Sequence, residues 1–283
     1  MKLVRFQQSS TGAPTAGILV DSRVFSLEGT AFADELAFIA AGEPALAAAR
    51  DLTATGQGTP LADVQLLAPI TRPPRIFGIG LNYKSHATEV QMKLQAVPTV
   101  FMKLSSSVIG PGAPIILPKN ATEPDYEAEL AVVIGKPGFR IAAADWQQHV
   151  FGYTILNDVS ARDVQLATSQ WTLGKSFPTF TPMGPAIVTA DEIPDPHALG
   201  IALTINGETL QSANTRDLLF KLPALIEYIS SITPLEPGDI ISTGTPEGVG
   251  MGRTPKRWIA PNEEIVITIE RLGELRNPTQ AEV

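Results

Sequence analysis

The sequence of 283 residues contains no cysteine and only three histidines, His86, His149 and His197. The absence of cysteine excludes disulfide bonds, a thiolate nucleophile and cysteine-ligated zinc or iron–sulfur sites. With so few histidines, a metal site would have to be built mainly from carboxylates. Oxygen ligands of this kind suit hard cations such as Mg²⁺ or Mn²⁺.

Positive charge is also scarce, with 21 Lys and Arg against 29 Asp and Glu and a formal net charge of −8. Nucleic-acid binding needs clustered cations that neutralise phosphates, so this balance argues against it. No apolar run approaches the roughly 18 residues of a membrane helix. The N-terminal residues lack the apolar core of a signal peptide. We therefore expect a soluble, cytoplasmic protein with neither a nucleic-acid nor a membrane partner.

The 44% of hydrophobic residues is enough for a large core, and the 24 prolines and 23 glycines suit many short strands and turns. Because strands do not alternate regularly with helices, a doubly wound parallel sheet fits poorly. We predict an α+β, mostly β fold, with a small N-terminal domain over 1–70 and a larger domain over 71–283. Predicted strands cover 3–6, 17–20, 75–79, 100–103, 127–134, 152–157, 186–189, 240–243 and 265–269, with helices over 43–51 and 222–231 and a tight turn at Asn206-Gly207.

Two carboxylates lie two positions apart at the start of a predicted strand, at Glu127 and Glu129. Residues two apart on a strand share a face, so these side chains point the same way. Like charges this close repel unless a cation lies between them, and a divalent metal is well suited to that place. A solvated strand face is the simpler interpretation of this segment alone.

A third acidic residue, Asp158, follows the predicted strand 152–157 where a helix is expected to begin. Asp158 or the nearby Ser160 would serve equally well as the N-cap of that helix. Combined with Glu127 and Glu129, however, Asp158 is a candidate third oxygen ligand for a divalent cation.

His86 and Glu89 are three residues apart in a short predicted helix, which places them on one face. A carboxylate beside an imidazole fixes its tautomer and raises its basicity, so the pair is a candidate dyad for activating water. An exposed ion pair is the alternative.

Two glycine-containing segments resemble nucleotide motifs only superficially. The segment that ends in Gly174-Lys175-Ser176 has Ser169 where a P-loop needs glycine, and Gly78-Ile79-Gly80 is followed by Tyr83 where a dinucleotide fingerprint needs glycine. The glycine-rich segment 242–252 is a loop whose backbone can approach a ligand closely. There is no Gly-x-Ser-x-Gly elbow for a serine hydrolase.

Together, five spaced motifs from about 75 to about 264 resemble the fumarylacetoacetate hydrolase family. The motifs are Gly-Leu-Asn-Tyr with His86-x-x-Glu89, Asp-Tyr-Glu127-x-Glu129-Leu, Asn-Asp158-Val-Ser-Ala-Arg162-Asp, Gly-Lys175-Ser-Phe and Thr-Gly-Thr245-Pro-x-Gly-Val-Gly. The resemblance implies that the larger domain is a mixed β-sandwich roll, preceded here by a small N-terminal α/β domain. Family members are usually homodimers. The sequence departs from the family pattern at two places. Pro178 stands where relatives often have Asp. Ala260-Pro261-Asn262-Glu263 stands where relatives have a Lys-Pro-Gly-Asp turn, and Asn262 should preserve this turn because Asn tolerates a positive φ.

The resemblance also implies roles for particular residues. Mg²⁺ or Mn²⁺ would be bound by Glu127, Glu129 and Asp158. The catalytic residues would be His86, Glu89 and Lys175, with His86 and Glu89 on a short lid. Substrate-binding residues would be Asn82, Tyr83, Arg162, Gln165 and Thr245.

The implied activity is metal-dependent hydrolysis of a carbon–carbon bond in a 2,4-dioxo acid, with release of pyruvate. Candidate substrates are acylpyruvates, fumarylpyruvate-type diacids and 2,4-dioxo-3-deoxy sugar acids. Decarboxylation of oxaloacetate and the isomerisation or hydration of 2-hydroxyhepta-2,4-diene-1,7-dioate are the alternatives. A non-catalytic protein that binds 2-oxo acids is the alternative from another class.

Overall fold

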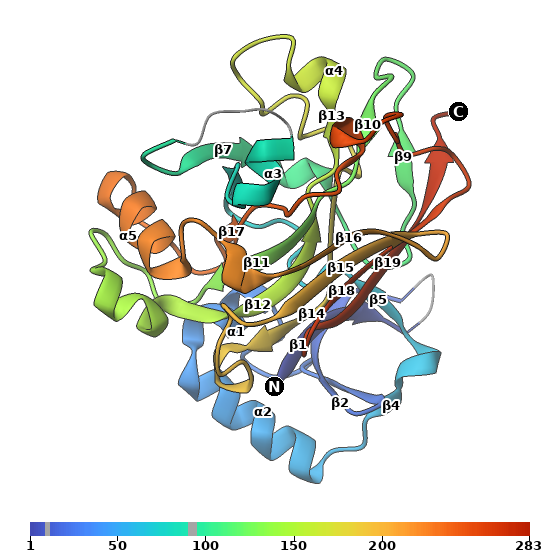
Figure 1. The fold of residues 1–283 in the computed structure, drawn as a ribbon. Coiled ribbons are helices and arrows are strands. Elements are labelled where there is room, and N and C mark those ends of the chain that lie inside the picture. The colour runs from blue at the N-terminus through green and yellow to red at the C-terminus, as the bar shows by residue number, and fades with distance from the viewer. Residues whose placement is uncertain (9–11, 90–94) are drawn as a thin grey trace.

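One long mixed sheet forms the centre of the molecule in a computed structural model, which describes residues 1–8, 12–89 and 95–283, apart from the side chains of residues 86–88 (Figure 1). The strands follow the order β4-β3-β2-β1-β14-β12-β11-β17-β6-β7, with β5 paired to β1 and β8 to β14. Their bounds are β1 Lys2–Gln7, β2 Thr15–Val20, β3 Arg23–Ser26, β4 Thr59–Pro60, β5 Gln65–Leu67, β6 Ile76–Gly80, β7 Thr99–Lys103, β8 Val108–Ile109, β11 Ala128–Ile134, β12 Val150–Asn157, β14 Thr181–Thr189 and β17 Ile240–Ser242.

A second sheet has the order β16-β15-β18-β19-β9, and β10 pairs with β13 in a separate short ladder. The strands are β9 Ile115–Leu117, β10 Pro124–Asp125, β13 Ser160–Ala161, β15 Gly200–Ile205, β16 Glu208–Asn214, β18 Glu264–Ile269 and β19 Gly273–Ala281. Among the described residues the α-helices are α1 Glu35–Ala41, α2 Glu43–Thr55, α3 Lys84–Glu89, α4 Arg162–Gln165 and α5 Leu222–Ile232. The prediction of a mostly β, α+β fold is confirmed.

Strand β11 is buried along its whole length. Leu130, Val132 and Ile134 join one core cluster, whereas Ala131 and Val133 join another that includes residues of the N-terminal unit. The interpretation of the Glu127–Glu129 face as solvated is therefore wrong. Because both faces are covered, the two carboxylates enter the protein interior.

Residues 1–70 contribute strands to the same sheet as the rest of the chain. Strand β1 pairs with β14, with Lys2 opposite Val188 and Leu3 opposite Ile187. The second core cluster also combines Phe38 and Ile39 of α1 with residues of β11 and β12. The division into domains at residue 70 stays a prediction.

Several local predictions are confirmed and others are wrong. Asn206 and Gly207 both have positive φ, as a type I′ turn requires, and Asn262 has a φ of 65°. Neither Asp158 nor Ser160 caps a helix, because α4 begins only at Arg162 and its N-cap, Ala161, makes no side-chain cap. In the described part of the chain, no helix has the length and apolarity needed to span a bilayer.

The double burial of β11 generates a stability prediction. Leu130→Ala removes a fully buried side chain and should lower the free energy of unfolding by about 2–5 kcal/mol. Thr268→Ala, at an exposed position of β18, should change it by no more than about 0.5 kcal/mol. Urea unfolding followed by circular dichroism measures both, and equal losses would contradict the proposed packing.

Candidate active site

Three acidic side chains meet in the interior where β11 begins and β12 ends. Strands β11 and β12 pair with Ala128 opposite Asn157, so Glu127 and Asp158 are adjacent, and the Asp158 N–H donates to the Glu127 carbonyl at 2.9 Å. Glu127, Glu129 and Asp158 are all buried, and one carboxylate oxygen from each lies within 4.8 Å of the others. The predicted carboxylate cluster therefore exists in the fold.

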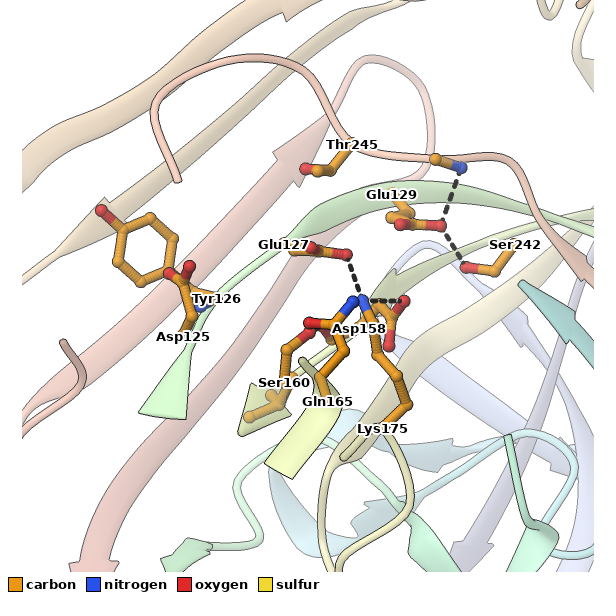
Figure 2. A network of polar contacts seen from close by, with 12 residues as sticks. Asp125, Tyr126, Glu127, Glu129, Asp158, Ser160, Gln165, Lys175, Ser242 and Thr245 are labelled. Carbon is orange, nitrogen blue, oxygen red and sulfur yellow. Dashed lines mark hydrogen bonds and ion pairs between the residues drawn. The ribbon is translucent and has the colours of Figure 1, made fainter. Parts of the chain in front are cut away.

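Two lysines hold this cluster. The Lys175 ammonium lies 2.8 Å from both Glu127 Oε2 and Asp158 Oδ2 (Figure 2). The Lys103 ammonium lies 2.7 Å from Asp158 Oδ1 and also donates to the backbone carbonyls of Val159, Lys175 and Phe180. Asp158 thus has a cation on each oxygen, which fixes its orientation without a helix cap.

Within the described part of the chain, the third carboxylate, Glu129, has only neutral donors in hydrogen-bond contact. Glu129 Oε2 accepts from the Ser242 hydroxyl at 2.6 Å and from the Gly244 N–H at 2.9 Å (Figure 2). Burial, together with the charges of Asp158 and Glu127, raises the pKa of Glu129 well above its usual value. Glu129 is the group whose charge most needs a further cation.

Arg162, in α4, crosses from this cluster to a fourth carboxylate. Its guanidinium pairs with Asp125 at 2.9 Å and with Glu127 at 2.7 Å, and it donates to Gln165 Oε1 at 2.9 Å. Burial opposes its charge, but Asp125 and Glu127 outweigh that penalty and raise the pKa of Arg162. Asp125 in turn accepts from the Gly250 and Met251 N–H groups.

The site carries a net negative charge. Burial disfavours the Lys175 ammonium, but the charges of Asp158 and Glu127 prevail and raise the pKa of Lys175, so it stays charged. With every group in its ordinary charge state, four carboxylates (Asp125, Glu127, Glu129 and Asp158) and three cations (Lys103, Arg162 and Lys175) sum to −1. Burial opposes the charges of both Lys103 and Glu129, because it lowers the pKa of the first and raises the pKa of the second. A divalent cation would make the sum +1, which favours an anionic ligand.

The cluster fits a hard divalent metal. It offers oxygen ligands from three side chains, which is the donor set that Mg²⁺ and Mn²⁺ prefer. A carboxylate has about four lone-pair sites, so Glu129 can keep its two donors and still bind an ion. Glu127, Glu129 and Asp158 are the residues that would hold the metal.

The predicted dyad is tested only in part. Helix α3 contains both His86 and Glu89, as expected. Glu89 Oε1 accepts from the Gly248 N–H at 2.9 Å, which ties α3 to the glycine-rich loop. The side chain of His86 lies outside the described residues, so the dyad itself stays a prediction.

Most predicted substrate-binding residues reach one cavity that encloses about 450 Å³, its open mouth included. The Thr245 hydroxyl at its edge donates to the Ala128 carbonyl and accepts from Gln211 Nε2. The polar side chains that line this cavity are Glu127, Glu129, Arg162, Gln165, Lys175 and Thr245.

Asn82 and Tyr83 do not line this cavity. The Asn82 carboxamide donates to the Phe220 and Thr243 carbonyls and accepts from the Phe220 N–H. Tyr83 is fully buried. The role of both residues in substrate binding stays a prediction.

Four residues of the site were not foreseen: Lys103, Asp125, Ser242 and Gly244. Asp125 stands two positions before Glu127, and that proximity was the available signal. Lys103 ends an apolar strand, where a lysine is usually exposed. Its acceptors come from residues 158–180, so no local pattern reveals them.

Comparison with known proteins now places this site in a family. Residues 75–280 match the model of the fumarylacetoacetate (FAA) hydrolase C-terminal domain. The chain belongs to the fumarylacetoacetate hydrolase family. This confirms the resemblance seen in the sequence motifs, and the family's members include hydrolases and isomerases. Residues 1–69 match a second model, described as Rv2993c-like, N-terminal.

Relatives in the family have different named reactions. The mitochondrial oxaloacetate tautomerase Fahd2a of Rattus norvegicus is 43% identical, over 98% of this chain and 91% of its own length. Maleylpyruvate hydrolase from Sphingobium sp. SYK-6, solved with manganese(II) and pyruvate, is 32% identical with a TM-score of 0.86 over the whole of both chains. The 2-hydroxyhepta-2,4-diene-1,7-dioate isomerase of Mycobacterium marinum is 34% identical, with a TM-score of 0.75 over 100% of this chain and 99% of that one.

The raised pKa of Glu129 predicts a conflict between stability and metal binding. A carboxyl group with a raised pKa binds its proton more tightly in the folded than in the unfolded protein, so metal-free stability falls as pH rises above the ordinary carboxyl range. Glu129→Gln removes that charge and keeps an acceptor for Ser242 and Gly244. We expect the metal-free variant to melt at a higher temperature than wild type at pH 8, with the difference shrinking in acid.

Melting curves with and without Mn²⁺ check this expectation. Mn²⁺ should raise the melting temperature of wild type and leave Glu129→Gln unchanged. The control Asp163→Asn alters a carboxylate on α4 that accepts from Thr122 and from the Val164 N–H, and it should respond to Mn²⁺ like wild type. If Glu129→Gln were less stable than wild type at pH 8 and still responded to Mn²⁺, the assignment of Glu129 as a metal ligand would be refuted.

Proposed function

We propose that this protein is a divalent-metal-dependent enzyme that forms the enolate of a short 2-oxo acid, and that keto–enol tautomerisation of oxaloacetate is its main reaction. The observation that carries the proposal is the buried cluster of Glu127, Glu129 and Asp158, which shares one cavity with Arg162 and Lys175. The oxaloacetate tautomerases that match almost the full chain support the choice of substrate.

Glu127, Glu129 and Asp158 would hold a divalent cation, which would supply a Lewis acid for a bound 2-oxo acid. The raised pKa of Lys175 keeps it an ammonium, so it stabilises negative charge on the substrate and does not remove a proton. Arg162, held by Asp125, adds a second fixed cation. Gln165 accepts from Arg162 and keeps the guanidinium facing the cavity.

Tautomerisation needs one proton to leave C3 and one to reach the C2 oxygen, with no other reactant. We assign removal of the C3 proton to His86, with Glu89 orienting the imidazole, and the imidazolium that forms then gives this proton to the C2 oxygen. The bond between Gly248 N–H and Glu89 would fix the far end of this dyad against the loop that also positions Glu129.

Hydrolysis of a 2,4-dioxo acid is the second candidate, supported by the maleylpyruvate hydrolase of the same fold. The dyad would then take a proton from water, hydroxide would attack the C4 carbonyl, and the C3–C4 bond would break to release the enolate of pyruvate. Both reactions pass through the enolate of a 2-oxo acid, of oxaloacetate in the first and of pyruvate in the second, so the same described residues would serve either one. The homodimer, the cytoplasmic location and the choice of Mg²⁺ or Mn²⁺ stay predictions.

Metal removal gives the first functional prediction. After treatment with EDTA, tautomerisation of oxaloacetate, followed by the ultraviolet absorbance of its enol, should fall to the uncatalysed rate. Added Mg²⁺ or Mn²⁺ should restore it. Pyruvate release from acylpyruvates and from oxaloacetate is measured in parallel. Full activity after chelation would contradict a metal-dependent mechanism, and tight binding of 2-oxo acids without any turnover would indicate a binding protein.

The dyad gives the second functional prediction. His86→Ala should lower tautomerisation, and any hydrolysis, by a factor of about 10² or more, which is typical for loss of a general base. Decarboxylation of oxaloacetate requires no such base and should persist in part. The control His149→Ala alters a histidine whose Nδ1 contacts the Lys136 carbonyl outside the site. Unchanged tautomerisation in His86→Ala would refute the assignment.

A further inference from the structure

The cavity is lined by two chemically different kinds of groups. The charged and polar side chains named above make up its charged side, and apolar groups that include Phe101, Leu166, Trp171 and Met251 make up its apolar wall. A 2-oxo acid whose head group binds to the charged side would have its far end near the apolar wall. The apolar wall would therefore limit the length of the substrate.

Two glycines of β6 make room for this wall. Gly78 and Gly80 are two residues apart, so they share a face of the strand. A methyl group on Gly78 would collide with the Phe101 ring, and one on Gly80 would collide with Trp171 Cζ3. The two rings thus occupy space that side chains would otherwise fill, and they contact each other edge to face at 5.6 Å between centroids.

The wall stands close to the reacting groups. The Lys175 ammonium lies 5.1 Å from the centroid of Phe101 while it pairs with Glu127 and Asp158. The backbone N–H of Lys175 also donates to the backbone carbonyl of Trp171 at 3.2 Å. The ammonium is thus close to the Phe101 ring, and Phe101 in turn contacts Trp171. A substrate held by the charged side would therefore meet these rings within a few carbon atoms.

From this arrangement we infer that Trp171, seated on Gly80, sets the maximum chain length of the 2-oxo acid. Compact acids such as pyruvate and oxaloacetate fit between the charged side and the ring, whereas longer acyl tails collide with it. This inference rests on the proposed function, since it assumes that the head group of a 2-oxo acid binds at the carboxylate cluster. It adds a specificity-determining residue and favours a four-carbon substrate over long-chain acylpyruvates.

The test uses the binding of unreactive 2-oxo acids of increasing length to the Mn²⁺-loaded protein: pyruvate, 2-oxobutanoate, 2-oxopentanoate and 2-oxohexanoate. Isothermal titration calorimetry gives each affinity. For wild type we expect affinity to drop by about 10-fold or more at the chain length that reaches the ring, because a pocket discriminates a misfitting methylene by about that factor. Trp171→Ala should abolish this drop, and Trp171→Leu should move it to a longer acid.

The matched control is Trp258→Ala, which alters a tryptophan that packs against Lys256 away from the cavity and should keep the wild-type cutoff. Melting temperatures confirm that each variant is folded, and Trp171→Leu keeps an apolar side chain if the alanine variant does not fold. An unchanged cutoff in the folded Trp171 variants would overturn the inference while leaving the proposed function intact. If wild type binds no 2-oxo acid of any length, the proposed function fails and the inference fails with it.

Discussion

Mutual repulsion among buried carboxylates is the constraint around which this molecule is organised. Glu127, Glu129 and Asp158 lie within 4.8 Å of one another in the interior, where an unpaired charge costs several kcal/mol. Lys103 and Lys175 pair with Asp158 and Glu127, whereas among the described residues Glu129 accepts only from a hydroxyl and a backbone N–H. Such an arrangement is unfavourable for stability alone, because uncharged residues would pack at lower cost. Under the proposed metal binding a divalent cation would supply the missing charge, and Glu129 would link metal binding to stability.

The glycine-rich loop after β17 connects the parts of this site. Its N–H groups donate to Glu129 from Gly244, to Glu89 from Gly248 and to Asp125 from Gly250. Positive φ values at Gly244 and Gly248, 97° and 101°, let the backbone turn toward successive carboxylates. A side chain at Gly248 would collide with the Leu210 carbonyl. The glycines are therefore needed for close backbone approach to the site's own carboxylates, and through Glu89 the same loop joins helix α3 to the cluster.

Local patterns predicted those features that depend on one stretch of chain. Alternation along β11 placed Glu127 and Glu129 on one face, and Asn206-Gly207 identified a hairpin. Features that depend on distant partners were beyond such patterns. One face of β11 is buried against residues of the N-terminal unit, 1–70. The buried Lys103 ammonium donates to four acceptors, all from residues 158–180. His197 likewise has partners distant in sequence, because it accepts from the Leu222 N–H at the start of α5 and packs beside Trp146.

Under the proposed function, the charged and the apolar groups of the cavity have separate roles. The charged side would hold the head group that the two candidate substrates share, a carboxylate and the neighbouring keto oxygen. The two candidate substrates differ in the group beyond C3, and that group would meet the wall made by Phe101 and Trp171. The charged side is connected by five ion pairs, so a change at any of them would disturb the carboxylate cluster. The wall rests on two glycines and van der Waals contact, so it is the part of the site where substitution changes substrate choice at least cost to the chemistry.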